Sequence, residues 1–231
     1  MLPQTILIIA ATESELSPAR KLLGDSAENI SFAATGAGKV SAAISTLELI
    51  KQLRPDWIIQ LGCAGAYPGS GLGIADVAIA TVEIFADEGV ETPEGFLSMR
   101  DRELPQASRD GELIFNKVPV DFPTAETIQE IRSSLDQPSR IEAGLFCTVS
   151  LGSGTDAASL RAEERWNPLV ENMEGAAAAL VAWRQRVRFS EIRGISNMTG
   201  DRNRKSWKIS EACEAAAAAA GAWIERVRTQ A

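Results

Sequence analysis

The sequence predicts an α/β fold built around a largely parallel sheet. Short, continuously apolar runs are typical of strands buried on both faces, and helical segments alternate with them along the chain. The chain has 231 residues, 45% of them hydrophobic and 23% charged, and no Pro/Ser-rich linker divides it. This length and composition suffice for one core, so we expect a single domain over residues 1–231.

The first elements follow this alternation closely. The run TILIIAAT at 5–12 predicts a buried strand, and a helix is expected over about 13–23. NISFAAT at 29–35 predicts the next strand, and a glycine-led turn and a helix then occupy 36–53. The segment 56–67 predicts a strand that runs into a glycine-rich turn.

The rest of the chain continues the pattern after one irregular stretch. Residues 74–85 alternate as in a strand, whereas 86–125 is rich in Pro, Gly and acids and predicts a long functional loop. The elements expected beyond it are a strand at 141–150, a helix at 156–166, a strand at about 168–172, an alanine-rich helix, a strand at 189–196 and a helix from about 206 to 228.

Polar and glycine-rich segments collect at the predicted carboxyl ends of the strands. Ligands of open α/β sheets bind beyond these ends, so the segments found there form the candidate site. They are Glu13 and Glu15, Gly36–Lys39, Cys63–Tyr67, Ser150–Thr155, Met173–Glu174 and Asn197–Asp201.

Charge and cysteine content exclude several classes of partner. The net charge is −8 and the basic residues are scattered, which disfavours nucleic acid and membrane surfaces as partners. The N-terminus lacks the pattern of a signal peptide, and no apolar run reaches the roughly 20 residues of a membrane span. Cys63, Cys147 and Cys213 are far apart in sequence, as expected in the reducing cytoplasm.

The chain contains no histidine. This excludes Ser-His-Asp triads, Cys-His pairs and histidine-based metal sites. Acid–base chemistry must therefore come from carboxylates, Lys, Tyr, Cys or bound water. We expect neither a cofactor nor a metal ion.

The segment ATGAGKVS at 34–41 resembles a nucleotide-binding loop without matching one. A phosphate loop needs Gly where the chain has Ala33 and Ser or Thr where it has Val40, and a dinucleotide loop needs Gly or Ala in place of Ser41. A tight turn whose backbone N–H groups face a ligand is the interpretation that remains.

Several acids admit both a structural and a chemical interpretation. Glu171 and Glu174 precede an alanine run, where Asn172 can cap the helix and acids favour its positive end. Glu13 and Glu15 follow the first strand, and either of them could be a general base for a water or an acid that caps the helix. The stretch 193–203 is either a plain polar turn or a segment whose side chains project into the site.

The chain contains, in this order, the four segments ATESE, TGAGKVSAA, LGCAGAY…GIADVAIA and NMEGAAAA…IRGISN. Together they resemble the purine nucleoside phosphorylase and nucleosidase superfamily, and within it the methylthioadenosine/S-adenosylhomocysteine nucleosidase branch. The futalosine hydrolases of this branch, enzymes of menaquinone biosynthesis, are also similar in ADEGVETPEGF and in GDRN…W ending at Trp207. The resemblance spans nearly the whole chain. It implies a three-layer α/β/α sandwich around a mixed, largely parallel sheet, and a homodimer or larger homo-oligomer.

The resemblance also implies roles for individual residues. Glu15 matches the carboxylate that activates the attacking water, Glu174 the acid that binds the ribose hydroxyls, and Met173 the side chain under the sugar. Arg193 matches an arginine near the water, and Cys63 stands where methylthioadenosine nucleosidases usually carry Ser. Further substrate contacts are expected from Gly36, Ala64, Gly65 and Ser153.

Asn197 stands where adenine-specific relatives use an Asp to protonate the purine N7. A carboxamide offers one acceptor and an NH2 donor, which complements the O6 and protonated N7 of a 6-oxopurine, although a flipped amide also suits adenine. Asp201 is the alternative proton donor. The loop at 86–125 is expected to cover the 5′ substituent, with Arg100, Arg102 or Lys117 near its carboxylate.

The predicted activity is hydrolysis of a 6-oxopurine nucleoside, with futalosine as the expected substrate. A nucleoside phosphorylase would differ in using phosphate, which the acids of AATESELS repel. A methylthioadenosine-type nucleosidase is disfavoured by Asn197. A non-catalytic nucleoside-binding protein is disfavoured by the combination of Glu15 with Arg193.

Overall fold

The computed structural model describes residues 5–24, 29–135, 140–200 and 203–229. The strands are β1 (Ile6–Ala10), β2 (Ile30–Ala34), β3 (Trp57–Ala66), β4 (Val77–Phe85), β5 (Gly89–Thr92), β6 (Gly95–Ser98), β7 (Ala107–Arg109), β8 (Glu112–Ile114), β9 (Lys117–Pro119), β10 (Ile141–Thr148), β11 (Val170–Asn172) and β12 (Arg188–Met198). The helices are α1 (Glu13–Leu23), α2 (Lys39–Leu53), α3 (Ala125–Ser134), α4 (Asp156–Trp166), α5 (Gly175–Gln185) and α6 (Ile209–Thr229).

The main sheet has the strand order β11-β10-β4-β12-β3-β1-β2, and β9 pairs with β4. Most neighbours run parallel, but β12 is antiparallel to β4. β11 also pairs with β3 through Val170–Ala66 and Glu171–Gly65, which closes β3, β11, β10, β4 and β12 into a ring. The predicted mixed, largely parallel sheet is confirmed.

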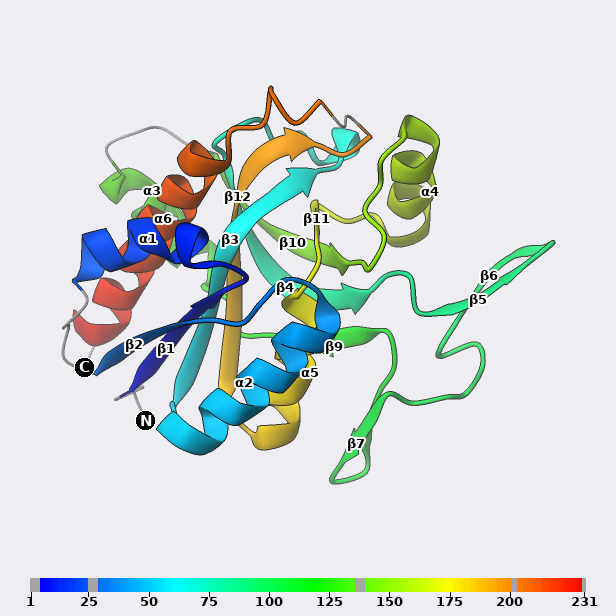
Figure 1. Ribbon diagram of the computed structural model, residues 1–231, viewed down its shortest axis with the longest axis horizontal. Helices are drawn as coiled ribbons and strands as arrows, with labels where there is room; N and C mark the ends of the chain where they lie inside the picture. Colours follow the sequence, from blue (N-terminus) through cyan, green and yellow to red (C-terminus); the bar gives the residue numbers. More distant parts are fainter. Residues whose placement is uncertain (1–4, 25–28, 136–139, 201–202, 230–231) are drawn as a thin grey trace.

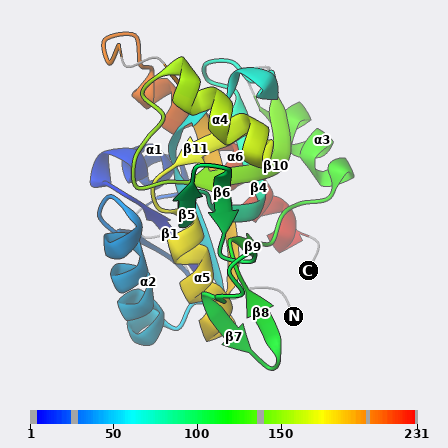
Figure 2. The ribbon, with the colours of Figure 1, turned by 90° about the vertical axis from the view of Figure 1, so that its right-hand side faces the viewer.

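Helices cover both faces of this sheet (Figures 1 and 2). On one face, Leu16 of α1, Ile131 of α3 and Trp223 of α6 join a buried cluster with the strands. On the other face, α2 and the alanines of α5 form a second cluster around Ile58. Small alanine side chains let α5 approach the sheet closely, and burial of both faces explains the apolar strands. The predicted three-layer sandwich is confirmed.

Threonine caps fix the starts of several helices. Thr12 forms a capping box with Glu15 at the start of α1, and Thr155 accepts a hydrogen bond from the Ala158 amide at the start of α4. Both helices cover the predicted residues, 13–23 and 156–166. Thr124 caps α3 in the same way.

The prediction of a long loop over 86–125 is wrong for most of this segment, because it contains five strands. The segment forms the hairpins β5–β6 and β7–β8, which project from the body in Figure 1, and then β9, which joins the main sheet. The helix α3 begins at its end, at Ala125. Strands this short carry too few residues to show a clear alternation in sequence, so their pairing is visible in the structure alone.

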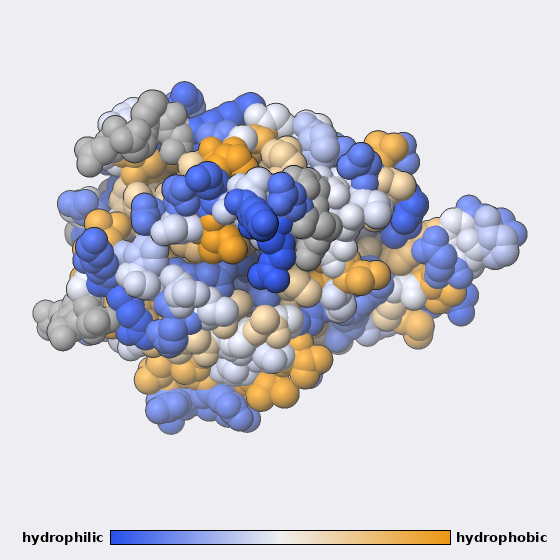
Figure 3. All heavy atoms as spheres, turned by 45° about the horizontal axis from the view of Figure 1, so that its top comes forward, coloured by the Kyte–Doolittle hydropathy of each residue, from blue (hydrophilic) through white to orange (hydrophobic). Residues whose placement is uncertain are grey.

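Apolar and charged side chains are interspersed over the face shown in Figure 3. Val40 and Ile44 on α2 are two of the large apolar residues that are exposed, with exposed fractions of 73% and 54%. Among the described residues, the model has no helix that combines the length and the hydropathy needed to cross a membrane.

Candidate active site

Arg193 of β12 lies at the centre of a buried polar cluster and is 1% exposed. Its Nε donates a hydrogen bond to Glu191 Oε1 at 2.6 Å, and its Nη2 donates to Glu174 Oε2 at 3.2 Å. Its Nη1 donates to the carbonyl of Cys63 at 3.2 Å. Burial alone would lower the pKa of Arg193, but the carboxylates of Glu191 and Glu174 outweigh this and raise it. The guanidinium is therefore a fixed positive charge that three hydrogen bonds orient.

Glu15 reaches the same cluster from the first turn of α1. Its Oε2 accepts a hydrogen bond from the Thr12 amide at 3.1 Å, and its Oε1 accepts one from the Cys63 amide at 3.3 Å. One carboxylate thus caps the helix and faces β3 at the same time. The two interpretations of Glu15, as a helix cap and as a general base, are therefore compatible.

Gly62 separates Glu15 from Arg193. A Cβ atom added at Gly62 would lie 2.6 Å from Arg193 Nη1 and 2.6 Å from Glu15 Oε1, and its φ of +149° is unfavourable for other residues. Glu15 and Arg193 can therefore both lie against residue 62 only because this residue has no side chain.

Glu174 stands at the junction of β11 and α5 and is 5% exposed. Its Oε1 accepts a hydrogen bond from the Gly38 amide at 3.0 Å, while its Oε2 faces Arg193. Asn172 lies two residues before the N-cap Glu174, and its Oδ1 accepts hydrogen bonds from the amides of Glu174 and Gly175 at 3.0 and 2.8 Å. The Glu174 carboxylate is therefore not used to cap its own helix. The neighbouring Met173 is 41% exposed.

Glu171 is held by structural contacts. Its Oε2 accepts hydrogen bonds from the Tyr67 hydroxyl at 3.0 Å and from Ser153 Oγ at 2.6 Å. The Ser153 amide donates to its Oε1 at 2.7 Å. Both hydrogen-bond donors of Ser153, a predicted substrate contact, are thus bound to Glu171.

Asn197 lies near the end of β12, where a bulge after Ile195 shifts the register against β3. Its Oδ1 accepts a hydrogen bond from Ser196 Oγ at 2.8 Å, and its Nδ2 donates to the Met198 carbonyl at 2.9 Å. A flipped amide would place two acceptor oxygens against each other at Met198, so these contacts fix the orientation of the carboxamide. One N–H and one lone pair remain for a ligand. Asp201 lies outside the described residues.

The predicted glycine-rich contacts lie beside these groups. Gly36, with a φ of +82°, donates its amide to the Ala11 carbonyl at 3.0 Å and so forms the turn before α2. The Ala64 carbonyl oxygen lies 3.3 Å from Ser196 Oγ, farther than Asn197 Oδ1 at 2.8 Å. A Cβ atom at Gly65 would lie 3.2 Å from Asn197 Nδ2, so the glycine lets this amide lie against β3.

The structure also reveals two buried acids that the sequence interpretation missed. Glu83 and Glu191 have no exposed surface, and their Oε2 atoms both lie against Gly175. Burial raises the pKa of Glu83 well above its ordinary value, as does the charge of Glu191. Burial also raises the pKa of Glu191, so two carboxylates this close favour keeping a proton on the pair. The available signal was an acid inside each of two apolar strands, VEIF and SEIRG.

Two cysteine thiols adjoin Glu15. Cys63 Sγ donates to Glu15 Oε1 at 3.8 Å, and Cys213 of α6 lies within 4.8 Å of both groups. A hydrogen bond from Cys213 lowers the pKa of Cys63, against its burial and the charge of Glu15, and Arg193 lowers it further. Cys213 was assigned no role from its sequence position.

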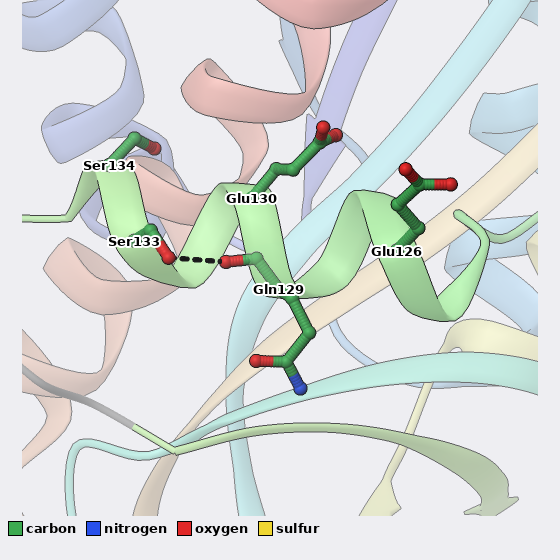
Figure 4. A pocket seen from close by; sticks show the side chains of 5 residues that line it. All are labelled: Glu126, Gln129, Glu130, Ser133 and Ser134. Carbon is green, nitrogen blue, oxygen red and sulfur yellow. Dashed lines mark hydrogen bonds between the residues drawn. The ribbon is translucent and has the colours of Figure 1, made fainter.

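Two hollows lie elsewhere on the molecule. One of about 580 Å³ lies over α3, where Ser133 donates to the Gln129 carbonyl at 2.8 Å (Figure 4). The other, of about 1120 Å³, is lined by Leu22, Ile74 and residues of α6. Their linings do not include Glu15, Glu174 or Arg193.

The cluster around Arg193 can support hydrolytic chemistry without a histidine. Glu15 offers an acceptor for the proton of a water molecule, and Glu174 offers acceptor sites for hydroxyl groups. Both negative charges would also favour a transition state that becomes positive between them.

Comparison with known proteins supports this interpretation. The family description "Phosphorylase superfamily" matches residues 6–228. Futalosine hydrolase of Thermus thermophilus is 30% identical over 184 residues, covering 78% of this chain and 75% of that protein. The 5′-methylthioadenosine/S-adenosylhomocysteine nucleosidase of Psychromonas ingrahamii is 29% identical over 176 residues, covering 75% of this chain and 70% of that protein.

A solved structure agrees in fold. The 5′-methylthioadenosine/S-adenosylhomocysteine nucleosidase from Neisseria meningitidis, in complex with methylthio-immucillin-A, superposes with a TM-score of 0.78 at 20% identity. The match covers 96% of this chain and 99% of that structure.

Proposed function

The chain belongs to the Phosphorylase superfamily as a hydrolase of N-ribosidic bonds, and from this premise we propose that its substrate is futalosine. The products are hypoxanthine and dehypoxanthine futalosine, in the biosynthesis of menaquinone. The observation that carries this proposal is the convergence of Glu15 and Glu174 on Arg193 from separate elements of the fold.

Glu15 acts as the general base. It accepts a proton from the water that attacks the anomeric carbon, while the bond to the purine breaks and the ribose becomes cationic. Its Oε1 is held by the Cys63 amide and its Oε2 by Thr12, so the carboxylate is positioned before the substrate binds.

Glu174 binds the ribose hydroxyls. Its two oxygens already accept hydrogen bonds from Gly38 and Arg193, and their remaining lone pairs accept from the vicinal hydroxyls. Charge-assisted hydrogen bonds of this kind contribute roughly 1.5–3 kcal/mol each. Arg193 positions the carboxylate, and the exposed Met173 packs under the sugar.

Asn197 selects the base. Its remaining N–H donates to O6 of a 6-oxopurine, and its remaining lone pair accepts from the protonated N7. The contacts with Ser196 and Met198 support this assignment, because they oppose the flip that would suit the exocyclic amine of adenine. A methylthioadenosine-type activity is the second candidate, since relatives at comparable identity carry that name.

Water is the nucleophile in this proposal. A phosphate ion at the same place would meet the negative charges of Glu15 and Glu174, both largely buried. The guanidinium nitrogens of Arg193 are already directed at Glu191, Glu174 and the Cys63 carbonyl. Phosphorolysis is therefore disfavoured.

Lys117 is our candidate for the carboxylate of the 5′ substituent. It belongs to β9, pairs with Ile84 of the main sheet, and lies with its Nζ 6.0 Å from the ring centre of Trp166. Trp166 donates to the carbonyl of Ala86 at 3.1 Å, next to the end of β4. An aromatic ring beside a cation suits an aromatic carboxylate.

We also propose that the protein is a homodimer or a larger homo-oligomer. Val40 and Ile44 are exposed on α2, the helix that begins beside Gly38 and Glu174. An apolar surface next to a site is typical of an interface between subunits. Light scattering on the purified protein measures the mass and distinguishes a dimer from a monomer.

A substrate panel tests the proposed function. Futalosine, inosine, methylthioadenosine and adenosine are incubated with the protein, with and without phosphate, and the free base is quantified. We expect hypoxanthine release from futalosine at a rate that phosphate does not change. Stimulation by phosphate would assign a phosphorylase, and preferred release of adenine would assign the methylthioadenosine-type activity.

A further inference from the structure

Glu15, Cys63 and Cys213 form a compact set of metal-ligating groups. One carboxylate oxygen and the two Sγ atoms lie within 4.8 Å of one another. Glu15 and Cys213 are buried, and Cys63 is partly accessible. The three groups come from α1, β3 and α6, so the fold rather than local sequence brings them together.

Close packing of α6 on the sheet creates this arrangement. Gly194 of β12 pairs with Cys63 of β3, and a Cβ atom at Gly194 would clash with the backbone carbonyl of Ala212. The glycine thus lets α6 approach the sheet, and Cys213 follows Ala212 directly. This approach brings the Cys213 thiol within 4.8 Å of the Cys63 thiol.

We propose that Glu15, Cys63 and Cys213 bind a thiophilic divalent metal ion such as Zn²⁺, and that the bound ion inhibits the enzyme by taking the Glu15 carboxylate as a ligand. Zinc accepts two thiolates and a carboxylate in a tetrahedral arrangement and leaves a fourth position for water. Its ligand atoms are then about 3.5–3.8 Å apart, so any two of the ligand atoms, which lie within 4.8 Å of one another, need to approach by about 1.3 Å at most. The two thiol protons leave on binding.

The surrounding charges are compatible with a cation. Arg193 lies beside Glu15 at Gly62, but its charge is offset by the carboxylates of Glu191 and Glu174. Two thiolates and a carboxylate then supply enough negative charge for a divalent ion. The inhibitory part of the inference rests on the proposed role of Glu15 as base, whereas metal binding does not.

Cobalt is the probe for binding, because thiolate-bound Co²⁺ absorbs in the near ultraviolet by charge transfer. The reduced protein is titrated with Co²⁺ without oxygen, and Zn²⁺ is then added. We expect one equivalent of Co²⁺ to give the band and Zn²⁺ to remove it. Cys63→Ser and Cys213→Ser should abolish the band, and Glu15→Gln should weaken Co²⁺ binding at least about tenfold, because an amide oxygen is a poorer ligand.

Cys147 provides the matched control. It is a buried thiol in a different cluster, with Tyr67 and Ile84, so Cys147→Ala should keep the band. Circular dichroism checks that each variant is folded, and Cys213→Ala replaces the serine variant if that one is not. Absence of the band in the parent protein, or its survival in a folded Cys213 variant, would overturn the site.

Inhibition is measured separately on futalosine hydrolysis. Zn²⁺ should inhibit the parent enzyme reversibly, with activity restored by a chelator. Cys213→Ser should keep its basal activity and lose at least about tenfold in sensitivity to Zn²⁺. Binding without inhibition would overturn the inhibitory part, and a parent protein that cleaves no nucleoside would contradict the proposed function while the cobalt titration still decides the site.

Discussion

Arg193 donates a hydrogen bond to Glu174 over 3.2 Å. Both side chains are buried, with exposed side-chain fractions of 2% and 6%. A buried ion pair of this kind is costly to break, because either partner alone leaves an unpaired charge away from water. Arg193 is also bound to Glu191, so it stays in place when Glu174 engages a ligand. This relationship makes Glu174 a fixed acceptor for hydroxyl groups.

Glu174→Gln should therefore impair binding of the ribose. The amide keeps the shape but loses the negative charge and part of the acceptor capacity, and we expect kcat/KM for futalosine to fall by about 10- to 100-fold. Steady-state kinetics measures the effect. The matched control is Glu171→Gln, an acid held by Tyr67 and Ser153, which should alter stability more than kcat/KM. Parental kinetics in the Glu174 variant would remove this residue from the ribose site.

Gly62→Ala should displace the base and the arginine together. The added Cβ atom would lie 2.6 Å from both Glu15 Oε1 and Arg193 Nη1. A misplacement on the scale of 1 Å costs catalysis about 100-fold, so kcat should fall at least that far in a variant that still folds. Gly73→Ala is the control, because its nearest atom is Asp76 Oδ2 at 3.7 Å. Equal activity of the two variants would contradict the geometry.

Glu83→Gln should change how stability depends on pH. The folded protein keeps a proton on the Glu83–Glu191 pair above the ordinary carboxyl pKa of 4.5, while the unfolded chain releases it. The free energy of unfolding of the parent should thus fall as pH rises from this value through the raised pKa of the pair, by up to about 1.4 kcal/mol per pH unit.

The variant should show a shallower fall, because the amide carries no proton to lose and Glu191 then stays ionised beside Arg193. Denaturant unfolding at a series of pH values from about 5 to about 8 measures both slopes. Glu48→Gln, at an exposed position of α2, should keep the parental slope. Parallel curves for the Glu83 variant and the parent would show that the pair holds no proton.

Asn197→Asp should shift the preference between bases. A carboxylic acid can protonate N7 and accept from the exocyclic amine of adenine, but it lacks the NH2 group that meets O6. We expect the ratio of kcat/KM for adenosine to that for inosine to rise by about tenfold or more, the equivalent of one hydrogen bond. An unchanged ratio would mean that Asn197 does not contact the base.

Local signals explain which elements were predictable. Helices α1 and α4 begin at Thr12 and Thr155, whose capping is encoded within a few residues. Helix α3 also has a threonine cap, but it follows the short hairpins of 86–125, and the sequence predicts no element over 126–140. The pairing of β11 with β3 depends on residues about 100 positions apart, Glu171 and Gly65 among them, so local patterns carry no trace of it.

The candidate site was predictable where residues follow strands. Glu15 and Glu174 stand beyond the ends of β1 and β11, which is where parallel sheets gather ligands, and Cys63 lies in the last part of β3. Glu83 and Cys213 were missed for a physical reason. Glu83 lies inside an apolar strand and Cys213 within an alanine-rich helix, so their importance follows from which neighbours the packed fold gives them.

Glu15→Gln tests the central claim most directly, by measuring hypoxanthine release from futalosine together with the affinity for futalosine. Glutamine preserves the capping box but cannot accept a proton from water. We predict that kcat falls by about 1000-fold, within the range typical of a lost general base, while Kd changes by less than about threefold because no binding contact is removed. Glu13→Gln, at an exposed position in the same helical turn, should retain parental activity. Parental hydrolysis by the Glu15 variant would contradict the account.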